Sequence, residues 1–171
     1  MWRMKRFVLI LMFFSNILFA NEIYTKEIDL PIEKYYPKLQ EAIKTNHMNI
    51  LYELNLLEKF KKAGYAKRFG KDFNKNHLKA VKTVLICNGY VGNLISNIDP
   101  DMMTLCPLRL TLISRAWGTK VVFLKSSHLA ASKKVKQLLS TLDDILIHTI
   151  NLTVDDYMKE AYSDDHQFTG N

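Results

Sequence analysis

The chain has 171 residues and a mass of 19.9 kDa, which suits one domain of ordinary size. Hydrophobic residues make up 48% and charged residues 24%. Both values are near the averages of soluble globular proteins, so they exclude a wholly disordered chain, a collagen-like repeat and a polytopic membrane protein. The formal net charge is +7, and two cysteines are too few for a disulfide-scaffolded miniprotein.

Residues 1–20 have the plan of a secretory signal peptide. Basic residues among the first six precede an uninterrupted apolar run from Phe7 to Phe14, and the small residue Ala20 stands before the polar Asn21. This apolar run is shorter than the roughly 20 residues that a membrane-spanning helix needs. We therefore predict cleavage after Ala20, a periplasmic or secreted mature protein, and no stable membrane span after cleavage. The alternative is an uncleaved N-terminal anchor.

Charge is unevenly distributed along the mature chain. Loss of the first twenty residues lowers the basic residues from 24 to 21 against 17 acidic ones, which leaves a net charge of +4. Nine basic residues lie between Lys59 and Lys82, against Asp72 alone. Such a run binds phosphates or anionic lipid headgroups, or it is a solvated loop. Because an exported protein rarely meets nucleic acid, we expect no nucleic-acid partner.

The first half of the mature chain predicts two strands and two helices. Residues 22–30 alternate in polarity and predict a short strand. Apolar residues then recur at spacings of three and four, which predicts a helix over 32–46. The apolar segment 49–54 predicts a second strand. Asn55 and Glu58 have the spacing of an N-cap, and they predict a short helix that ends at Gly64 and buries Leu57 and Phe60. The polar stretch 65–79 is expected to be a long exposed connection.

The second half predicts a strand, a helix, a hairpin and a closing helix. In the strand 80–88, Lys82 indicates the solvent side, so Cys87 is expected on the opposite face. A helix follows over 90–98, then strands over 105–114 and 120–125 joined by a turn at 117–119, and a long helix over 133–150. These elements predict an α+β fold in which helices pack on one face of a mainly antiparallel sheet. The expected domain is 21–150, and 151–171 is expected to be an acidic tail with one turn of helix near 155–161.

Several segments resemble one known family in the right order. They are the strand–helix opening, the Leu- and Lys-rich segment 54–64, the sequence Ile86-Cys87-Asn88-Gly89 at the end of a strand, and Leu105-Cys106-Pro107-Leu108-Arg109 after the Asp99-Pro100 stop. On these residues the chain resembles domain of unknown function 302 over roughly residues 22–150. Gly89 stands where the family usually has proline, and Cys106-Pro107 reverses the usual order. The resemblance implies a compact α+β fold similar to the TATA-binding-protein-like class, a frequent homodimer and no established activity.

Cys87 and Cys106 are the first candidates for chemistry, because export would bring them into an oxidising compartment. One interpretation is a disulfide between two strands. Another is a pair of thiolates for redox work or for a soft metal such as copper(I), assisted by Met102, Met103 or His47. A third is two buried, inert thiols on the core sides of their strands. No Cys-x-x-Cys motif occurs, so a thioredoxin-like mechanism has no support.

The remaining polar candidates are weaker. The five histidines lack ligand spacing, and His128 beside Ser126 and Ser127 lacks the Gly-x-Ser-x-Gly elbow of a serine hydrolase. Asp143 and Asp144 are expected on a solvated helix face. One further set of apolar residues has two interpretations: Leu108, Leu110, Leu112, Phe123 and Leu142. They line an apolar pocket between the sheet and the long helix, with Arg109 at its rim, or they fill the hydrophobic core.

These observations predict an exported, non-enzymatic binding or interaction module. Its partner is expected to be a small ligand or an envelope protein, and Cys87, Asn88, Cys106 and Arg109 are the predicted ligand-binding residues. The alternative is a thiol-based metal-binding or redox protein that uses Cys87 and Cys106. No cofactor is predicted, although copper and haem stay open, and a homodimer is expected from the family resemblance.

Overall fold

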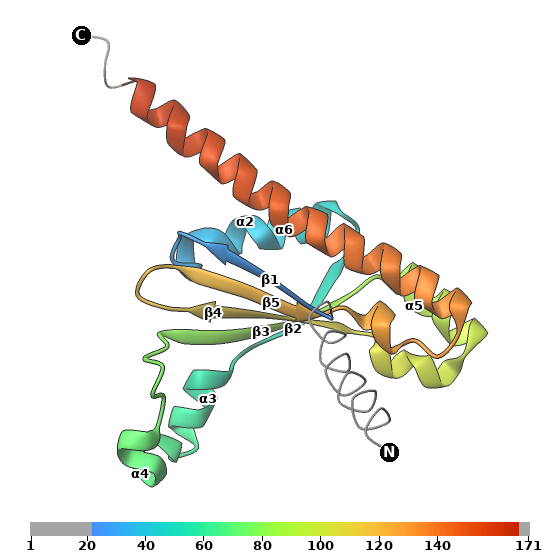
Figure 1. The fold of residues 1–171 in the computed structure, drawn as a ribbon, viewed down its shortest axis with the longest axis horizontal. Helices are drawn as coiled ribbons and strands as arrows, with labels where there is room; N and C mark the ends of the chain where they lie inside the picture. Colours follow the sequence, from blue (N-terminus) through green and yellow to red (C-terminus); the bar gives the residue numbers. More distant parts are fainter. Residues whose placement is uncertain (1–21, 168–171) are drawn as a thin grey trace, which may run out of the picture.

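The computed structural model describes residues 22–167, which form a five-stranded antiparallel sheet with helices (Figure 1). The predicted signal peptide lies outside the described residues. The strands are β1 (Ile23–Ile28), β2 (Asn49–Asn55), β3 (Ala80–Cys87), β4 (Leu108–Ser114) and β5 (Thr119–Leu124). Their order across the sheet is β1-β5-β4-β3-β2, and every neighbouring pair is antiparallel. The predicted α+β class is confirmed.

Helices cover one face of this sheet (Figure 1). They are α2 (Ile32–Thr45) and the long α6 (Lys133–Gln167), and α5 (Gly89–Ile98) packs beside α6 at the end of the sheet. Two short helices, α3 (Leu56–Lys62) and α4 (Tyr65–Phe69), instead project from one end of the sheet. Short 3-10 helices occupy Gly70–Asp72, Pro100–Leu105 and Ser126–Leu129. Of the helices in residues 22–167, none is both long and apolar enough to cross a membrane.

The core lies between the sheet and α2, α5 and α6. The inward side chains of β4 and β5 and the facing side chain of α6 are at most 3% exposed, namely Leu108, Leu110, Leu112, Val121, Phe123 and Leu142. These residues therefore fill the hydrophobic core and do not line a pocket between the sheet and the long helix. Burying such aliphatic and aromatic side chains stabilises the fold by about 1.5–3 kcal/mol for each residue.

The prediction for the two faces of β3 is wrong. Val84 and Ile86 are the residues of β3 that are fully buried in the core, and they share their side of the strand with Lys82. Lys82 is tolerated on this side because it lies at the end of the sheet. Its Nζ pairs with Glu53 at 3.0 Å and sits 4.1 Å from the centre of the Tyr36 ring. Cys87 consequently lies on the other side of the strand from the core residues.

Three further expectations differ from the structure. Residues 65–69 form a helix, and Phe60 is 44% exposed whereas Leu57 is buried. The acidic residues after position 150 continue α6 to Gln167 and so form more than one helical turn. Asp143 is only 2% exposed, because the segment 126–129 folds over its face of α6. The helix at 65–69 and the end of α6 lack an apolar helical period, and the burial of Asp143 depends on a tertiary contact.

Candidate functional site

The two cysteines meet at one end of the sheet. Cys87 is the last residue of β3, and Cys106 follows the 3-10 helix Pro100–Leu105 just before β4. Strand pairing sets Ile86 opposite Leu108, which brings the two chain segments together. The sulfur atoms are 2.9 Å apart, and both side chains are half-buried free thiols. The predicted pair is therefore contiguous in space, although 19 positions separate its members.

A third sulfur-bearing side chain approaches the pair around Gly92 of α5. A methyl group at Gly92 would lie 3.7 Å from the Cys106 sulfur, 3.8 Å from the Cys87 sulfur and 3.9 Å from the terminal methyl of Met103. The absence of a side chain at Gly92 therefore leaves space beside two thiols and the terminal methyl group of a methionine. We call Cys87, Cys106, Met103 and Gly92 the sulfur site. A glycine within a helical period often signals such close packing, and this is the signal that the sequence carried.

The sulfur site favours protonated thiol over thiolate at Cys106. Burial is the main cause and the contact with Cys87 the second cause that together raise the pKa of the Cys106 thiol from its ordinary value of 9.0 to about 12. Cys106 thus keeps its proton at neutral pH. Such a thiol is a poor nucleophile, because the thiolate is the reactive form. A metal cation that replaces the proton would stabilise the thiolate form of Cys106.

Asn88 holds the end of β3 in place. Its side-chain oxygen accepts a hydrogen bond from the backbone N–H of Val91 at 2.9 Å and so caps α5. Its side-chain nitrogen donates to the backbone carbonyl of His47 at 3.1 Å. Both ends of the amide are therefore used, and Asn88 positions the residue beside it, Cys87. The His47 side chain is exposed.

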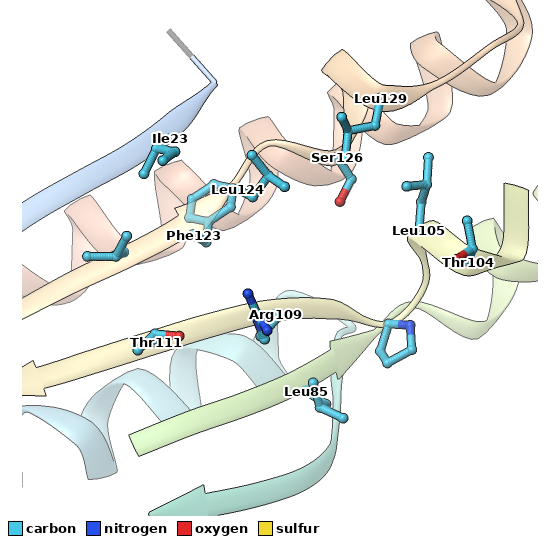
Figure 2. Close-up of a pocket in the computed structure, with 12 residues that line it drawn as sticks. Ile23, Leu85, Thr104, Leu105, Arg109, Thr111, Phe123, Leu124, Ser126 and Leu129 are labelled. Atoms are coloured by element: carbon cyan, nitrogen blue, oxygen red, sulfur yellow. The ribbon is translucent and has the colours of Figure 1, made fainter. Parts of the chain in front are cut away.

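Arg109 belongs to a separate pocket on the sheet face that α2, α5 and α6 do not cover. Figure 2 shows Arg109 of β4 in the middle of this pocket, with Leu124 of β5 and Leu85 of β3 on either side. The pocket has a volume of about 420 Å³, which is within the range of small-molecule sites. Its lining is mostly apolar, and none of the residues that form it is acidic. The structure thus groups Cys87, Asn88 and Cys106, and none of these three residues lines the pocket around Arg109.

Asp143 and the serines do not form a hydrolase triad. The Asp143 carboxylate accepts hydrogen bonds from the backbone N–H groups of Ser126 at 3.2 Å and Ser127 at 3.1 Å. Burial raises the pKa of Asp143, while these hydrogen bonds and the charge of His128 act in the opposite direction. Asp143 therefore ties the 3-10 helix Ser126–Leu129 to α6. The prediction that Asp143 lies on a solvated helix face is wrong, because the helical pattern of the sequence does not report this long-range contact.

Clusters of the usual metal ligands are absent from the part of the chain that the structure describes. Within residues 22–167, no group of three or more His, Cys, Asp or Glu side chains is placed to hold a metal ion. The sulfur site differs in kind, because it combines two cysteines with a methionine. Thiolate and thioether ligands together select soft ions such as copper(I) rather than hard cations.

Fold and site together define a small α+β protein with a half-buried dithiol at one end of an antiparallel sheet. The model of the family described as "Domain of unknown function DUF302" matches residues 24–151. The chain belongs to this family. No curated protein matches the chain.

A solved structure of the same family has a similar fold. It is described as "Crystal structure of uncharacterized conserved protein DUF302 from Bacillus stearothermophilus". The match has a TM-score of 0.67 at 17% sequence identity, and it covers 77% of this chain and 98% of that chain. At this identity the likeness concerns the fold alone. It agrees with the resemblance that the sequence motifs indicate.

Proposed function

We propose that this chain is a small, non-enzymatic binding protein whose ligand is a soft metal ion, copper(I), held at the sulfur site. The observation that carries the proposal is the convergence of Cys87, Cys106 and Met103 around Gly92. Two thiols alone would serve a disulfide equally well. A methionine side chain whose terminal methyl group approaches the same glycine adds a thioether, which matches the ligand preference of copper(I).

Binding exchanges protons for the metal ion. When copper(I) enters, each thiol transfers its proton to solvent and its sulfur lone pair forms a bond to the metal. Copper keeps its oxidation state, so no oxidant or reductant is needed. Because Cys106 holds its proton to about pH 12, the proton competes with copper across the neutral range. The affinity for copper(I) is therefore expected to rise with pH.

A chelator competition tests the proposal. The reduced full chain is titrated with copper(I) in the absence of oxygen, against a chromogenic chelator of copper(I). We expect one ion bound per chain and at least about a hundredfold loss of affinity in Cys87→Ser and in Cys106→Ser. Met103→Leu is expected to lose about tenfold, and the neighbouring Met102→Leu is the matched control with no loss.

The contrary outcome is a disulfide. It would form by exchange with an oxidised disulfide, which accepts both electrons and is released as two thiols. Native mass spectrometry would then find a chain two hydrogen atoms lighter that takes up no copper(I) even after reduction. Unchanged affinity in both serine variants would also overturn the proposal.

A second candidate function rests on the pocket around Arg109. Its guanidinium lies in a largely apolar cavity of about 420 Å³ that has no acidic lining residue, and Arg109 is exposed there. This arrangement favours a small organic anion with an apolar tail, because a carboxylate pairs with arginine while the tail covers the leucines. Such a ligand fits the predicted role as a binding module.

Thermal shifts with matched probes test this second function. Octanoate is expected to raise the melting temperature through mass action, whereas octanol, which lacks the charge, is expected to do so much less. Arg109→Gln should remove the difference between the two probes. Equal shifts for both, or the same difference in the variant, would exclude anion recognition by Arg109.

Export and homodimer formation stay predictions. The intact mass of the chain recovered from the periplasm or the medium tests export. A mass that corresponds to a chain beginning at Asn21 would support cleavage, and a mass that includes residues 1–20 would contradict it. The homodimer requires a sedimentation coefficient that depends on protein concentration. An envelope protein partner is a further proposal, to be sought by crosslinking in cells that carry the Arg109→Gln variant as control.

A further inference from the structure

The segment that carries α3 and α4, residues 56–79, extends away from the rest of the molecule. We call it the arm. It leaves the end of β2 and returns at the start of β3, so both attachments lie at one end of the sheet, away from α5 (Figure 1). Leu57 is buried, whereas every residue from Glu58 to Asp72 is exposed. The arm thus presents most of its surface to its surroundings.

The arm is strongly basic. It contains eight lysines and arginines and two acidic residues, Glu58 and Asp72, for a net charge of +6. Both acids pair locally, Glu58 with Lys61 at 3.2 Å and Asp72 with Lys75 at 2.7 Å. The other basic side chains include Lys67 and Lys71, whose charges add to the field around the arm. A concentrated field of this sign attracts an anionic surface.

Aromatic rings line a groove in the same arm. The ring centres of Phe60 and Tyr65 are 5.8 Å apart, and those of Tyr65 and Phe69 are 5.9 Å apart. The groove has a volume of about 660 Å³. Aliphatic side chains also line it, namely Leu56, Leu57, Leu78 and Val81, together with Phe73 and the polar residues Arg68, Asp72 and Asn74. Phe69 is 52% exposed, and the Arg68 guanidinium lies 5.8 Å from its ring centre.

We propose that the arm docks on an anionic phospholipid bilayer. The lysines would face the lipid phosphates while Phe60, Tyr65 and Phe69 enter the interfacial layer, where amphipathic aromatic rings are favoured. A nucleic acid would use the charge but needs open ring faces for stacking. Here the rings pack against one another at 54–56° and line a mostly apolar groove. This combination fits an acyl boundary better than a base.

Vesicle partitioning tests the proposal with the full chain. The probe is a vesicle of equal parts phosphatidylglycerol and phosphatidylcholine, compared with phosphatidylcholine alone. Lys67→Gln with Lys71→Gln is expected to lower the partition coefficient for the anionic vesicle about 25-fold, about fivefold for each lysine. Lys133→Gln with Lys134→Gln, at the exposed start of α6, is the matched control for the same change of charge. All variants keep residues 1–20, so any binding by that apolar segment is common to them.

Aromatic variants and local protection sharpen the test. Phe69→Ser should weaken binding to the anionic vesicle, whereas Leu129→Ser, at a side chain of similar exposure (50% against 52%), should not. Hydrogen exchange should slow in residues 60–73 when anionic vesicles are added. Equal binding to both vesicle types, or equal losses in both lysine pairs, would overturn the proposal. Binding of a single-stranded oligonucleotide with the same Lys67 and Lys71 dependence, and none to vesicles, would instead assign the arm to nucleic acid.

Discussion

The helices α3 and α5 begin in the same way and lead to opposite kinds of surface. Each starts with an asparagine whose side-chain oxygen accepts a hydrogen bond from the backbone N–H three residues later, Asn55 from Glu58 at 3.3 Å and Asn88 from Val91 at 2.9 Å. After Asn55 the chain enters the exposed, basic arm. After Asn88 it packs against two thiols and the core, and the Asn88 amide makes a second hydrogen bond to His47.

This difference teaches that a local signal starts a helix but does not decide its surroundings. Under the proposed docking, the arm acts through the sum of many exposed charges, each of which contributes little. The sulfur site consists of a few half-buried groups, so under the proposed function single substitutions there are expected to have large effects on copper(I) binding. The arm is attached by few buried side chains, whereas α5 is held by the core through Ile95 and by the 3-10 helix that precedes β4.

The largest effect on stability is expected where the arm meets the sheet. Leu57→Ala removes the buried side chain of α3 and should lower the free energy of unfolding by about 2–3 kcal/mol. Denaturant unfolding measures this loss, and hydrogen exchange should show it concentrated in residues 56–79. Phe60→Ala is the control, with a loss below about 1 kcal/mol because its ring is exposed. Equal losses would show that the arm is packed more uniformly than its burial implies.

The two N-caps provide the next comparison. Asn88→Ala removes two hydrogen bonds and should cost about 1–2 kcal/mol, whereas Asn55→Ala removes one long, exposed bond and should cost about 0.5 kcal/mol. Asn88→Ala should also weaken copper(I) binding, because Cys87 loses its neighbouring support. If both variants unfold at the same denaturant concentration, the two N-caps contribute equally to stability, which would contradict the expected difference between α3 and α5.

Gly92→Ala separates stability from metal binding. The added methyl group meets its neighbours at ordinary contact distances of 3.7–3.9 Å, so it fits in the folded protein. A glycine-to-alanine change within a helix stabilises by up to about 1 kcal/mol. The same methyl group occupies the space beside the sulfur atoms, so copper(I) affinity should fall about tenfold while the melting temperature holds or rises. Loss of both, or of neither, would show that Gly92 does not shape the site.

The last comparison is a pH dependence, whose effect near neutral pH is the smallest of these and appears only above pH 9. Above pH 9 the unfolded chain loses its Cys106 proton, whereas the folded chain keeps it to about pH 12, so the free energy of unfolding falls as the pH rises through this window. Burial raises the pKa of Tyr35 and of Tyr36 as well, and these tyrosines act in the same direction. Unfolding of the metal-free, reduced chain is therefore compared with Cys106→Ser. The free energy of unfolding of the variant should decline less steeply at alkaline pH. Identical curves would contradict a raised pKa of Cys106 in the folded chain.

Much of the fold was predictable because its signals are local. The apolar period of α2, the Asn55 cap, the turn before β5 and the alternation of β4 each follow from neighbouring residues. The cysteine pair was predicted as a candidate, and its contact now supports that choice. The groove of Phe60, Tyr65 and Phe69 was missed, since residues 65–69 lack an apolar helical period and their rings meet only after the chain turns at Gly64.

By itself, the sequence determined the five strands, the helices α2, α3 and α5, the first part of α6, the Asn55 cap, and that two thiols are available. Only the tertiary structure decided which side of β3 is covered, because a period of two defines two faces and Lys82 at the sheet end belongs to the covered one. It also decided that Asp143 is buried and that Cys87 and Cys106 touch. These outcomes depend on how distant segments pair and pack, since a 2.9 Å contact across 19 positions requires the register between β3 and β4.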